Sequence, residues 1–174
     1  MFQKNSFSLN GGEFMNGKLK KIGIKPIGIV RCSRKETKDD YWGSVTSRIE
    51  LDSNQFDSRA LLGLDDFSHC EVVFIMDRVP KCEIEKGARH PRNCIHLPKV
   101  GIFAQRSKAR PNRIGISRCK IIKVENLTIE VEALDAIDKT PVIDIKPYMK
   151  EFAPIGDIYQ PEWTKEIMSH YYFK

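Results

Sequence analysis

The 174-residue chain lacks any long hydrophobic run, and no apolar stretch approaches the roughly 18 residues that a helix needs to span a bilayer. This absence excludes a membrane-spanning protein. Residues 1–20 also lack the continuous apolar core of a secretory signal, and they are polar and rich in Gly and Asn. We therefore expect a flexible lead-in over residues 1–20, followed by a single domain.

Glycine-rich phosphate-binding motifs are absent as well. Neither G-x-G-x-x-G nor G-x-x-x-x-G-K-[ST] occurs, which removes the usual sequence grounds for a dinucleotide-binding βαβ unit or a P-loop. The G-x-S-x-G turn of the α/β-hydrolases is missing too. Any nucleotide chemistry must therefore use a less common scaffold.

Cysteine is sparse, with five residues that are odd in number and widely spaced. Reduced thiols in a cytoplasmic protein are the simplest interpretation. One short segment does bring together Cys82, His90, Cys94 and His96. Its C-x7-H-x3-C-x-H spacing matches no common zinc pattern, so we expect no metal.

Short runs rich in Ile and Val dominate the rest of the chain and are typical of β-strands. They cover residues 22–31, 44–51, 70–78, 100–106, 113–124 and 127–134. The last run alternates apolar and polar residues, and a hairpin-length Glu-Asn-Leu turn joins it to the run before. The spacing predicts a mainly β fold, with one antiparallel β-barrel domain over residues 21–150.

Helical signals are few. Residues 56–64 begin with Asp57 as a start signal and contain Gly63 as a stop, which predicts a short early helix. Pro161 stands at the entry of a helical pattern over residues 161–172. We therefore expect a C-terminal extension, residues 151–174, that contains a helix.

Positive charge is concentrated between Arg78 and Lys120, where twelve Lys and Arg face two acids in a chain of net charge +6. Such a concentration attracts a polyanion such as nucleic acid through counterion release and long-range steering. The alternative is that these charges spread over several solvated faces.

The densest basic segment is GIFAQRSKARPNRIGIS, residues 101–117. Its apolar ends suggest strands, whereas Pro111-Asn112 signals a turn. The cations between the two ends are Arg106, Lys108, Arg110 and Arg113. A rigid loop held by two core strands would present them with fixed geometry to an anion or a nucleotide.

Two further clusters could carry chemistry. In DDYWG (39–43), the pair Tyr41 and Trp42 forms either an exposed platform for a base or an aromatic cap on the core. GARHPR (87–92) holds His90, the best-placed titratable group near neutral pH, between Arg89 and Arg92.

A third cluster, ALDAIDKTPVIDIKPY (133–148), alternates carboxylates with apolar residues. Asp138 could be purely a turn residue. Asp144 and Lys146 stand two apart in a strand, face the same side and could pair as an element of a site.

Taken together, ARHPR, VGIFAQRSKARPNRIGIS, LDAIDKTPVIDIKPY and IKPIGIVRCS make the chain similar to the TrmO (YaeB, or TsaA-like) family. The match runs in unbroken order from Ile24 to Tyr148 and includes two unusual strings, R-x-x-x-R-P-N-x-I-G and D-I-K-P-Y. The resemblance implies a β-barrel, a homodimer and S-adenosylmethionine as cofactor. It also implies N6-methylation of a threonylcarbamoyl-modified adenosine beside the anticodon of tRNA.

By the same resemblance, Arg106 after FAQ and Ile116 after Ile-Gly correspond to cofactor contacts. The other implied contacts are Asp40, Tyr41, Trp42, Asp77, Arg78, Glu132, Ala133, Leu134 and Asp135. The chain departs from the family at DDYWG, where Pro-Arg-Gln is common, and at Asp77-Arg78, where His-Gln can occur. Arg113 also replaces a Pro, and Lys139 replaces a Gly.

The chemistry of the cofactor fits these residues. Its carboxylate suits the planar fork of Arg106, and its methyl must lie in line with the nucleophile. The exocyclic amine of adenine becomes acidic as it is methylated, so His90, Asp138 or Asp144 could accept its proton. Side chains expected to hold the tRNA are Arg89, Arg92, Lys108, Arg110, Arg113, Lys146 and Tyr148. The alternative is a non-catalytic β-barrel module that binds RNA or senses S-adenosylmethionine.

Overall fold

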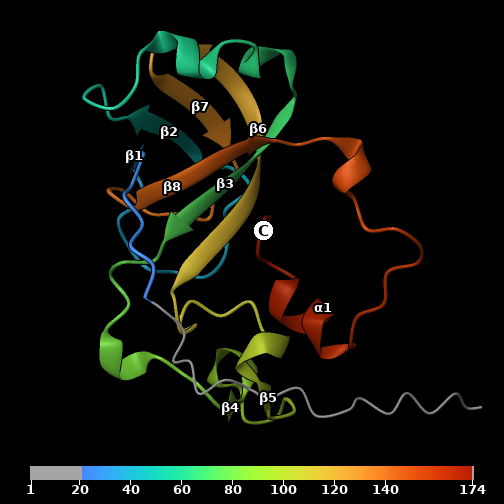
Figure 1. Cartoon of the computed structure of the whole chain (residues 1–174). Coiled ribbons are helices and arrows are strands. Elements are labelled where there is room, and N and C mark those ends of the chain that lie inside the picture. The colour runs from blue at the N-terminus through green and yellow to red at the C-terminus, as the bar shows by residue number, and fades with distance from the viewer. Residues whose placement is uncertain (1–20, 174) are drawn as a thin grey trace, which may run out of the picture.

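The computed structural model describes residues 21–173, and its centre is a closed antiparallel β-barrel (Figure 1). Six strands pair in the order β1-β2-β7-β6-β3-β8. Their bounds are β1 Gly28–Cys32, β2 Thr46–Leu51, β3 His69–Ile75, β6 Ile114–Glu125, β7 Thr128–Glu132 and β8 Pro141–Pro147. The predicted mainly β barrel is confirmed, whereas the expected lead-in over residues 1–20 lies outside the described residues.

The barrel core follows from alternation along the strands. In β3, Cys70, Val72 and Phe74 face inward and are at most 1% exposed. The other side chains with at most 1% exposure in the core cluster are Val30, Ile49, Cys119, Ile129, Val131, Leu134 and Val142. Burying each large apolar side chain contributes about 1.5–3 kcal/mol, so this cluster is the main source of stability.

The five cysteines are all free, and two of them belong to the core. Cys70 and Cys119 are register partners across β3 and β6. Burial raises the pKa of the Cys70 thiol to about 12 and that of Cys119 even further. Both side chains are therefore neutral and act as small hydrophobic groups.

Two predicted elements differ from the structure. Residues 56–64 form two 3-10 turns, Ser58–Leu61 and Leu64–Asp66, in place of an α-helix. Asp57 does cap the first turn by accepting from the N–H of Arg59. Gly63, at φ 81°, interrupts the helical path after one turn, and a single turn cannot repay the cost of helix nucleation.

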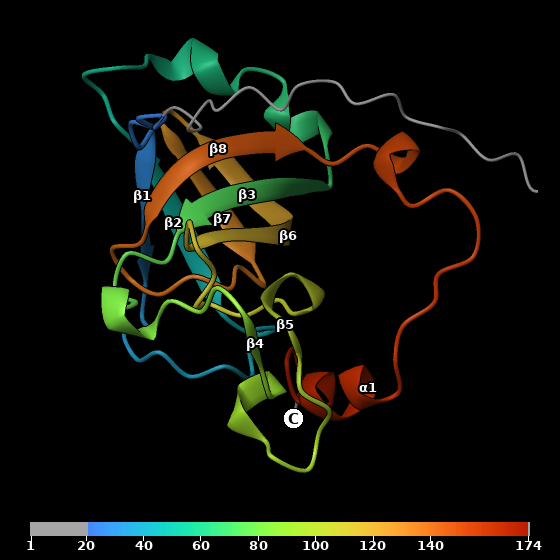
Figure 2. The ribbon, with the colours of Figure 1, turned by 60° about the horizontal axis from the view of Figure 1, so that its bottom comes forward.

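The strand predicted over residues 100–106 is mostly wrong. Only Val100–Gly101 (β5) pairs, with β4 (Ala88–Arg89), and Ile102–Ala104 then forms a 3-10 turn. The buried side-chain amide of Gln105 donates to the carbonyl oxygens of Arg89 and Val100, which fixes this turn. This small sheet belongs to an insertion between β3 and β6 that lies beyond one end of the barrel (Figure 2).

The C-terminal segment leaves the barrel after β8 and then returns to it (Figure 1). A 3-10 turn at Lys150–Phe152 is followed by a stretch that is exposed at every residue as far as Glu162. Helix α1, Trp163–Met168, confirms the predicted C-terminal helix. The last described residues bond to the backbone of residues 41–43. Within residues 21–173, no helix has the length and apolar character required to cross a membrane.

Candidate functional site

Three connections between strands lie at the same end of the barrel, namely β1–β2, β3–β6 and β7–β8. Because the strands alternate in direction, the end of β1, the start of β2, the end of β3, the start of β6 and the β7–β8 connection all lie there. The residues predicted as cofactor contacts come from these segments. The fold therefore gathers at one barrel end groups that are more than 90 residues apart in the sequence.

The turn at residues 39–43 is held by the side chain of Arg34. Its guanidinium donates to the carbonyl oxygens of Lys38 and Asp40 at 2.5 and 2.7 Å and lies 3.6 Å from the centre of the Trp42 ring. Trp42 is only 3% exposed, and its indole N–H donates to the carbonyl of Asp39. Of the two interpretations of this residue, the structure supports the aromatic cap on the core.

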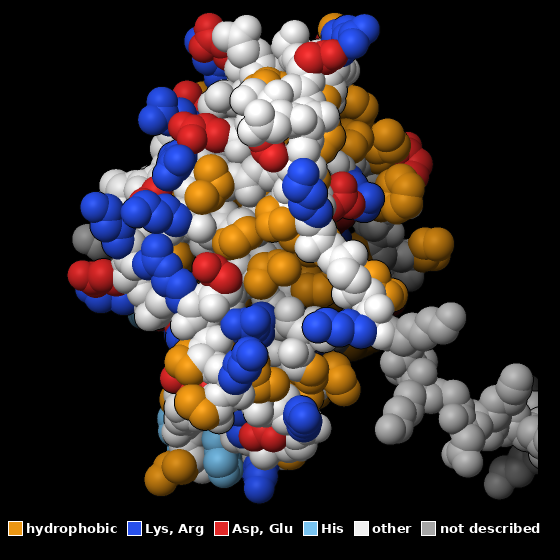
Figure 3. All heavy atoms as spheres, turned by 60° about the vertical axis from the view of Figure 1, so that its left-hand side comes forward, with side chains coloured by type: hydrophobic (Ala, Val, Ile, Leu, Met, Phe, Trp, Pro, Cys, Tyr) orange, Lys and Arg blue, Asp and Glu red, His pale blue; other side chains and the backbone are white. Residues whose placement is uncertain are grey.

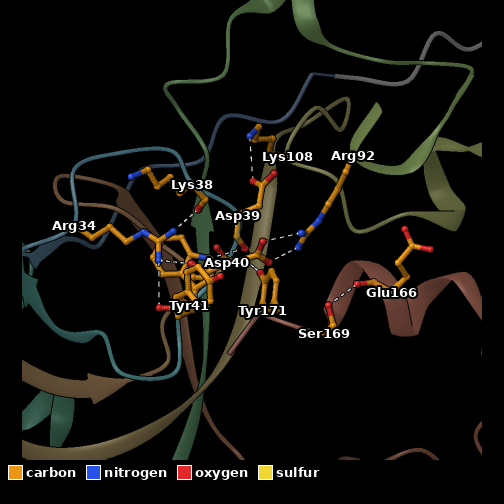
Figure 4. A network of polar contacts seen from close by, with 12 residues as sticks. Arg34, Lys38, Asp39, Asp40, Tyr41, Arg92, Lys108, Glu166, Ser169 and Tyr171 are labelled. Atoms are coloured by element: carbon orange, nitrogen blue, oxygen red, sulfur yellow. Dashed lines mark hydrogen bonds and ion pairs between the residues drawn. The ribbon is translucent and has the colours of Figure 1, made fainter. Parts of the chain in front are cut away.

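Two ion pairs connect this turn to the insertion (Figure 4). Arg92 binds the carboxylate of Asp40 in a bidentate manner, at 2.9 and 2.7 Å. Lys108 binds the carboxylate of Asp39 at 3.1 Å. Two cations predicted to hold tRNA are thus engaged by acids of the same chain.

Asp135, in the β7–β8 connection, is the titratable centre of the site. Its backbone N–H donates to the Ser117 hydroxyl, and its carboxylate accepts a hydrogen bond from the hydroxyl of Tyr171. Burial and the nearby carboxylate of Asp39 raise the pKa of Asp135 to about 7, against the opposing effect of the cations around it. Those cations are Arg34, Arg106 and Lys108. This carboxyl therefore changes charge near neutral pH.

The three residues before Asp135 were also predicted as cofactor contacts. Ala133 has a left-handed φ of 64°, and Leu134 is fully buried. Glu132, the last residue of β7, lies 3.7 Å from the Lys120 ammonium. Leu134 is thus a core residue, and Asp135 is the member of this predicted set that offers a polar side chain to the site.

Arg106 and Ile116 lie next to one another, as their correspondence to cofactor contacts requires. One guanidinium nitrogen of Arg106 donates to the carbonyl oxygen of Ile116 at 2.9 Å. Ile116 is 48% exposed on β6, and Arg106 forms no ion pair with any residue that the structure describes. An exposed guanidinium, an apolar side chain and the carboxyl of Asp135 are therefore available together.

Several other predicted cations stabilise the fold itself. Arg110 donates to the carbonyls of Ile102 and Gln105, and Arg113 donates to those of Asp77 and Val79.

Arg78 binds the carbonyls of Asp138 and Lys35. In β4, the Nε of Arg89 is buried and has no hydrogen-bond partner among the described residues. Much of the charge of the basic loop is thus directed at backbone oxygens.

The three proton acceptors proposed from the sequence form their hydrogen bonds and ion pairs with residues other than Arg106 and Asp135. The Nδ1 of His90 bonds to the carbonyl of Leu97 at 2.7 Å, in the insertion. Asp138 accepts from the N–H of Cys32 and lines a separate polar groove with Arg31 and Arg48.

The third acceptor, Asp144, pairs with Lys146 at 2.6 Å on β8, so this predicted pairing is confirmed. Beyond it, Tyr148 lies under the guanidinium of Arg118. Asp144, Lys146 and Tyr148 run along β8 away from the loop end of the barrel.

The Cys and His residues of the insertion do not converge. Among residues 21–173, no three His, Cys, Asp or Glu side chains are grouped so that they could hold a metal ion. The Nε2 of His96 instead bonds to the Glu166 carboxylate of α1 at 2.6 Å.

On one face of the molecule, the basic side chains do not merge into one surface (Figure 3). On the face shown in Figure 3, Lys and Arg lie in separate groups between acidic and apolar side chains. Three lysines of the insertion, Lys81, Lys86 and Lys99, are exposed and form no ion pair within the described part of the chain.

Sequence reasoning missed the contribution of the C-terminal residues. Tyr171 reaches Asp135, and Tyr172 lies near enough to Asp135, Arg106 and Arg118 for each to shift its pKa. The aromatic run HYYF at 170–173 was the available signal, although nothing local in the sequence shows where it docks.

The fold and the site define a β-barrel protein with a candidate site for a small charged ligand on the loops at one barrel end. Residues 37–153 match the tRNA-methyltransferase O N-terminal domain, and the chain belongs to that family. The resemblance drawn from the sequence motifs is thereby confirmed.

Named relatives agree with this assignment. The chain is 34% identical over 106 residues to the tRNA (adenine(37)-N6)-methyltransferase of Mus musculus, a match that covers 60% of this chain and 24% of that protein. It is 32% identical over 139 residues to a probable S-adenosyl-L-methionine-binding protein of Methanothermobacter thermautotrophicus, covering 78% of this chain and 96% of that protein.

Solved structures give the same result. The crystal structure of TrmO from Pseudomonas aeruginosa matches with a TM-score of 0.67 and 25% identity, over 84% of this chain and 63% of that chain. The chain spans about a quarter of the length of the mouse relative, so the match to that protein is confined to part of it.

Proposed function

We propose that this protein is an S-adenosylmethionine-dependent methyltransferase that acts on N6 of a tRNA adenosine beside the anticodon. Membership of the family supports the proposal, as do the names of the relatives in mouse and M. thermautotrophicus. The observation that carries it is the placement of Arg106, Ile116 and Asp135 together at the loop end of the barrel.

The donor set at this end fits the cofactor. S-adenosylmethionine, when bound, supplies a methyl group on a sulfonium and brings a carboxylate, an ammonium and an apolar chain. Arg106 offers planar N–H donors to the carboxylate, and Asp135 offers an acceptor to the ammonium or to a ribose hydroxyl. Ile116 offers apolar contact.

The contribution of the chain to the reaction is proposed to be mainly positioning. His90, Asp138 and Asp144 remain the sequence-based candidates for accepting the proton, but their contacts lie away from Arg106 and Asp135. Holding two reactants in line can by itself supply a large part of a rate enhancement. The proposal therefore assigns no general base.

The tRNA is proposed to bind through the insertion. Lys81, Lys86 and Lys99 are exposed and carry charge that no described acid neutralises by an ion pair. Arg92 and Lys108, by contrast, are occupied by Asp40 and Asp39. Backbone phosphates supply affinity through such free cations, and the pocket supplies selectivity.

A homodimer is also part of the proposal. The stretch after β8 exposes Phe152, Ile155, Ile158 and Tyr159 by 74%, 101%, 71% and 88%. Apolar side chains in that number on one exposed stretch favour burial against a second copy. A tRNA substrate and free thiols fit a cytoplasmic location.

Mass spectrometry of nucleosides tests the proposal. Purified protein is incubated with labelled S-adenosylmethionine and with tRNA that either carries or lacks the threonylcarbamoyl group. Transfer of one labelled methyl to the modified adenosine supports the proposal. If neither tRNA gains a methyl, the proposed activity is wrong even though the family assignment stands.

A further inference from the structure

The C-terminal residues lie directly on the candidate cofactor site. The backbone N–H groups of Tyr41, Trp42 and Gly43 donate to the carbonyl oxygens of His170, Tyr171 and Tyr172 at 2.9, 2.9 and 2.8 Å. The contact therefore joins the turn of residues 39–43 to a segment about 130 positions away. We call residues 169–173 the strap.

The turn that the strap covers offers three successive backbone donors. Tyr41 has a left-handed φ of 65°, and the three N–H groups that follow one another from it all point to the same partner segment. Successive N–H groups of this kind form a concave nest that binds anions such as carboxylates and phosphates. In this structure three strap carbonyls take up all of these donors.

Side chains of the strap occupy the rest of the site. The hydroxyl of Tyr171 donates to Asp135, and the rings of Tyr171 and Tyr172 meet edge to face. Tyr172 lies beside Asp135, Arg106 and Arg118, whose charges all act on its pKa. The strap thus engages both the nest and the Arg106–Asp135 pair.

The packing is close at Gly43. A Cβ added to this residue would lie 2.5 Å from the carbonyl oxygen of Tyr172 and 2.8 Å from the ring of Phe173. All three of the nearest atoms belong to the strap. A methyl group at position 43 is therefore incompatible with the docked strap. Outside residues 42–44, every other described atom lies farther from it than these three strap atoms.

The connection to the barrel allows the strap to leave. Residues 149–162 are exposed throughout and include Gly156 at φ 82°. Helix α1 is held to the insertion by one exposed pair, Glu166 with His96. An exposed pair of this kind contributes little to stability, so it holds α1 to the insertion only weakly.

We propose, on the basis of the proposed function, that the strap competes with S-adenosylmethionine for this site. The docked strap closes the site, and cofactor binding requires its release. A ligand that binds only the open form has its affinity reduced by the fraction of open molecules. Variants that release the strap should then bind the cofactor at least tenfold more tightly.

The test uses the full chain and two release variants. Gly43→Ala collides with the strap from the side of the turn, and Tyr171→Phe removes only the hydroxyl that bonds to Asp135. Tyr159→Phe serves as the matched control, because Tyr159 is 88% exposed and lies outside the site. Thermal unfolding verifies that each variant is folded, and calorimetry measures the dissociation constant of S-adenosylmethionine.

The proposal is supported if the two release variants bind S-adenosylmethionine more tightly than wild type and the control binds it equally well. Equal or weaker binding by folded release variants overturns it. If wild type and all variants fail to bind, the proposed function itself is wrong, and the strap proposal falls with it.

Hydrogen exchange on the wild-type protein gives a second test that needs no variant. The N–H groups of Ser169 and Tyr171 donate to the carbonyl oxygens of Glu166 and Met168, and these bonds should open more often once the strap has left the turn. Saturating S-adenosylmethionine should therefore speed exchange of these two amides. Binding that leaves this exchange unchanged or slows it contradicts the proposal.

Discussion

The hydroxyl of Tyr171 donates a hydrogen bond to the carboxylate of Asp135, across 36 positions of sequence. The contact joins the C-terminal segment to a carboxyl whose pKa burial raises to about 7. It also places an aromatic hydroxyl from outside the matched residues 37–153 at the candidate site. The predictions below follow from this arrangement and from the barrel that supports it.

The raised pKa of Asp135 predicts a pH-dependent stability. Folded protein binds this proton up to about pH 7, whereas the unfolded chain releases it near the ordinary value of 3.8. Between these values the folded state holds more protons, so the free energy of unfolding falls as the pH rises, by at most about 1.4 kcal/mol per pH unit. Partial exposure reduces this slope.

Asp135→Asn removes this dependence. Urea unfolding at several pH values from 4 to 8 should show the variant gaining stability relative to wild type as the pH rises through the window. Asp65→Asn, on an exposed turn, should follow the wild-type curve. Parallel curves of unfolding free energy against pH for wild type and Asp135→Asn would contradict this prediction, because they would show that the carboxyl has the same pKa in the folded and the unfolded protein.

Gly115 is required where β6 crosses the core. A Cβ at this position would lie 2.4 and 2.5 Å from two atoms of the Phe74 ring, which is itself 1% exposed. Gly115→Ala should therefore destabilise the fold by about 1–3 kcal/mol through overpacking.

Gly101→Ala is the matched control for this change, because no atom lies within 4 Å of its added Cβ. Chemical denaturation measures both variants. The prediction is wrong if Gly115→Ala lowers the free energy of unfolding no more than Gly101→Ala does, because Phe74 would then move aside without loss of stability.

The unpaired lysines of the insertion predict a salt-dependent contribution to tRNA binding. Replacing Lys81, Lys86 and Lys99 with Ala should lower the slope of log affinity against log salt by about two, if each contacts one phosphate. Filter binding over a range of salt concentrations measures this slope.

A matched triple variant uses lysines that already pair with an acid of their own segment. Lys38, Lys123 and Lys165 lie 2.7, 2.6 and 2.9 Å from such carboxylates. Their replacement should change the slope much less. Equal changes in the two triple variants would argue against a binding surface on the insertion.

Most of the barrel could be predicted because its signal is local. The alternation in residues 127–134 and the Glu-Asn-Leu turn correspond to β7 and its hairpin with β6, where Asn126 takes φ 53°. The run at 100–106 misled because Ile102 is buried by a turn and not by a strand, and apolar composition alone does not separate the two.

The partners of the charged groups could not be predicted, since they depend on tertiary contacts. The sequence shows that Arg110 and Arg113 are basic, but only the fold shows that their donors go to backbone carbonyls. In the same way, burial of Trp42 under Arg34 and docking of Tyr171 on Asp135 join segments that no local pattern relates.

Calorimetric titration with S-adenosylmethionine of the wild type, Arg106→Ala and Arg59→Ala tests the site most directly. Arg59 is also an exposed arginine, and it pairs with Asp57 on a loop at the other barrel end, so it controls for loss of charge. We predict binding by wild type and Arg59→Ala and a loss of about tenfold or more for Arg106→Ala, because a charge-assisted bidentate contact is removed. Equal affinity of the two variants would contradict the assignment of this barrel end as the cofactor site.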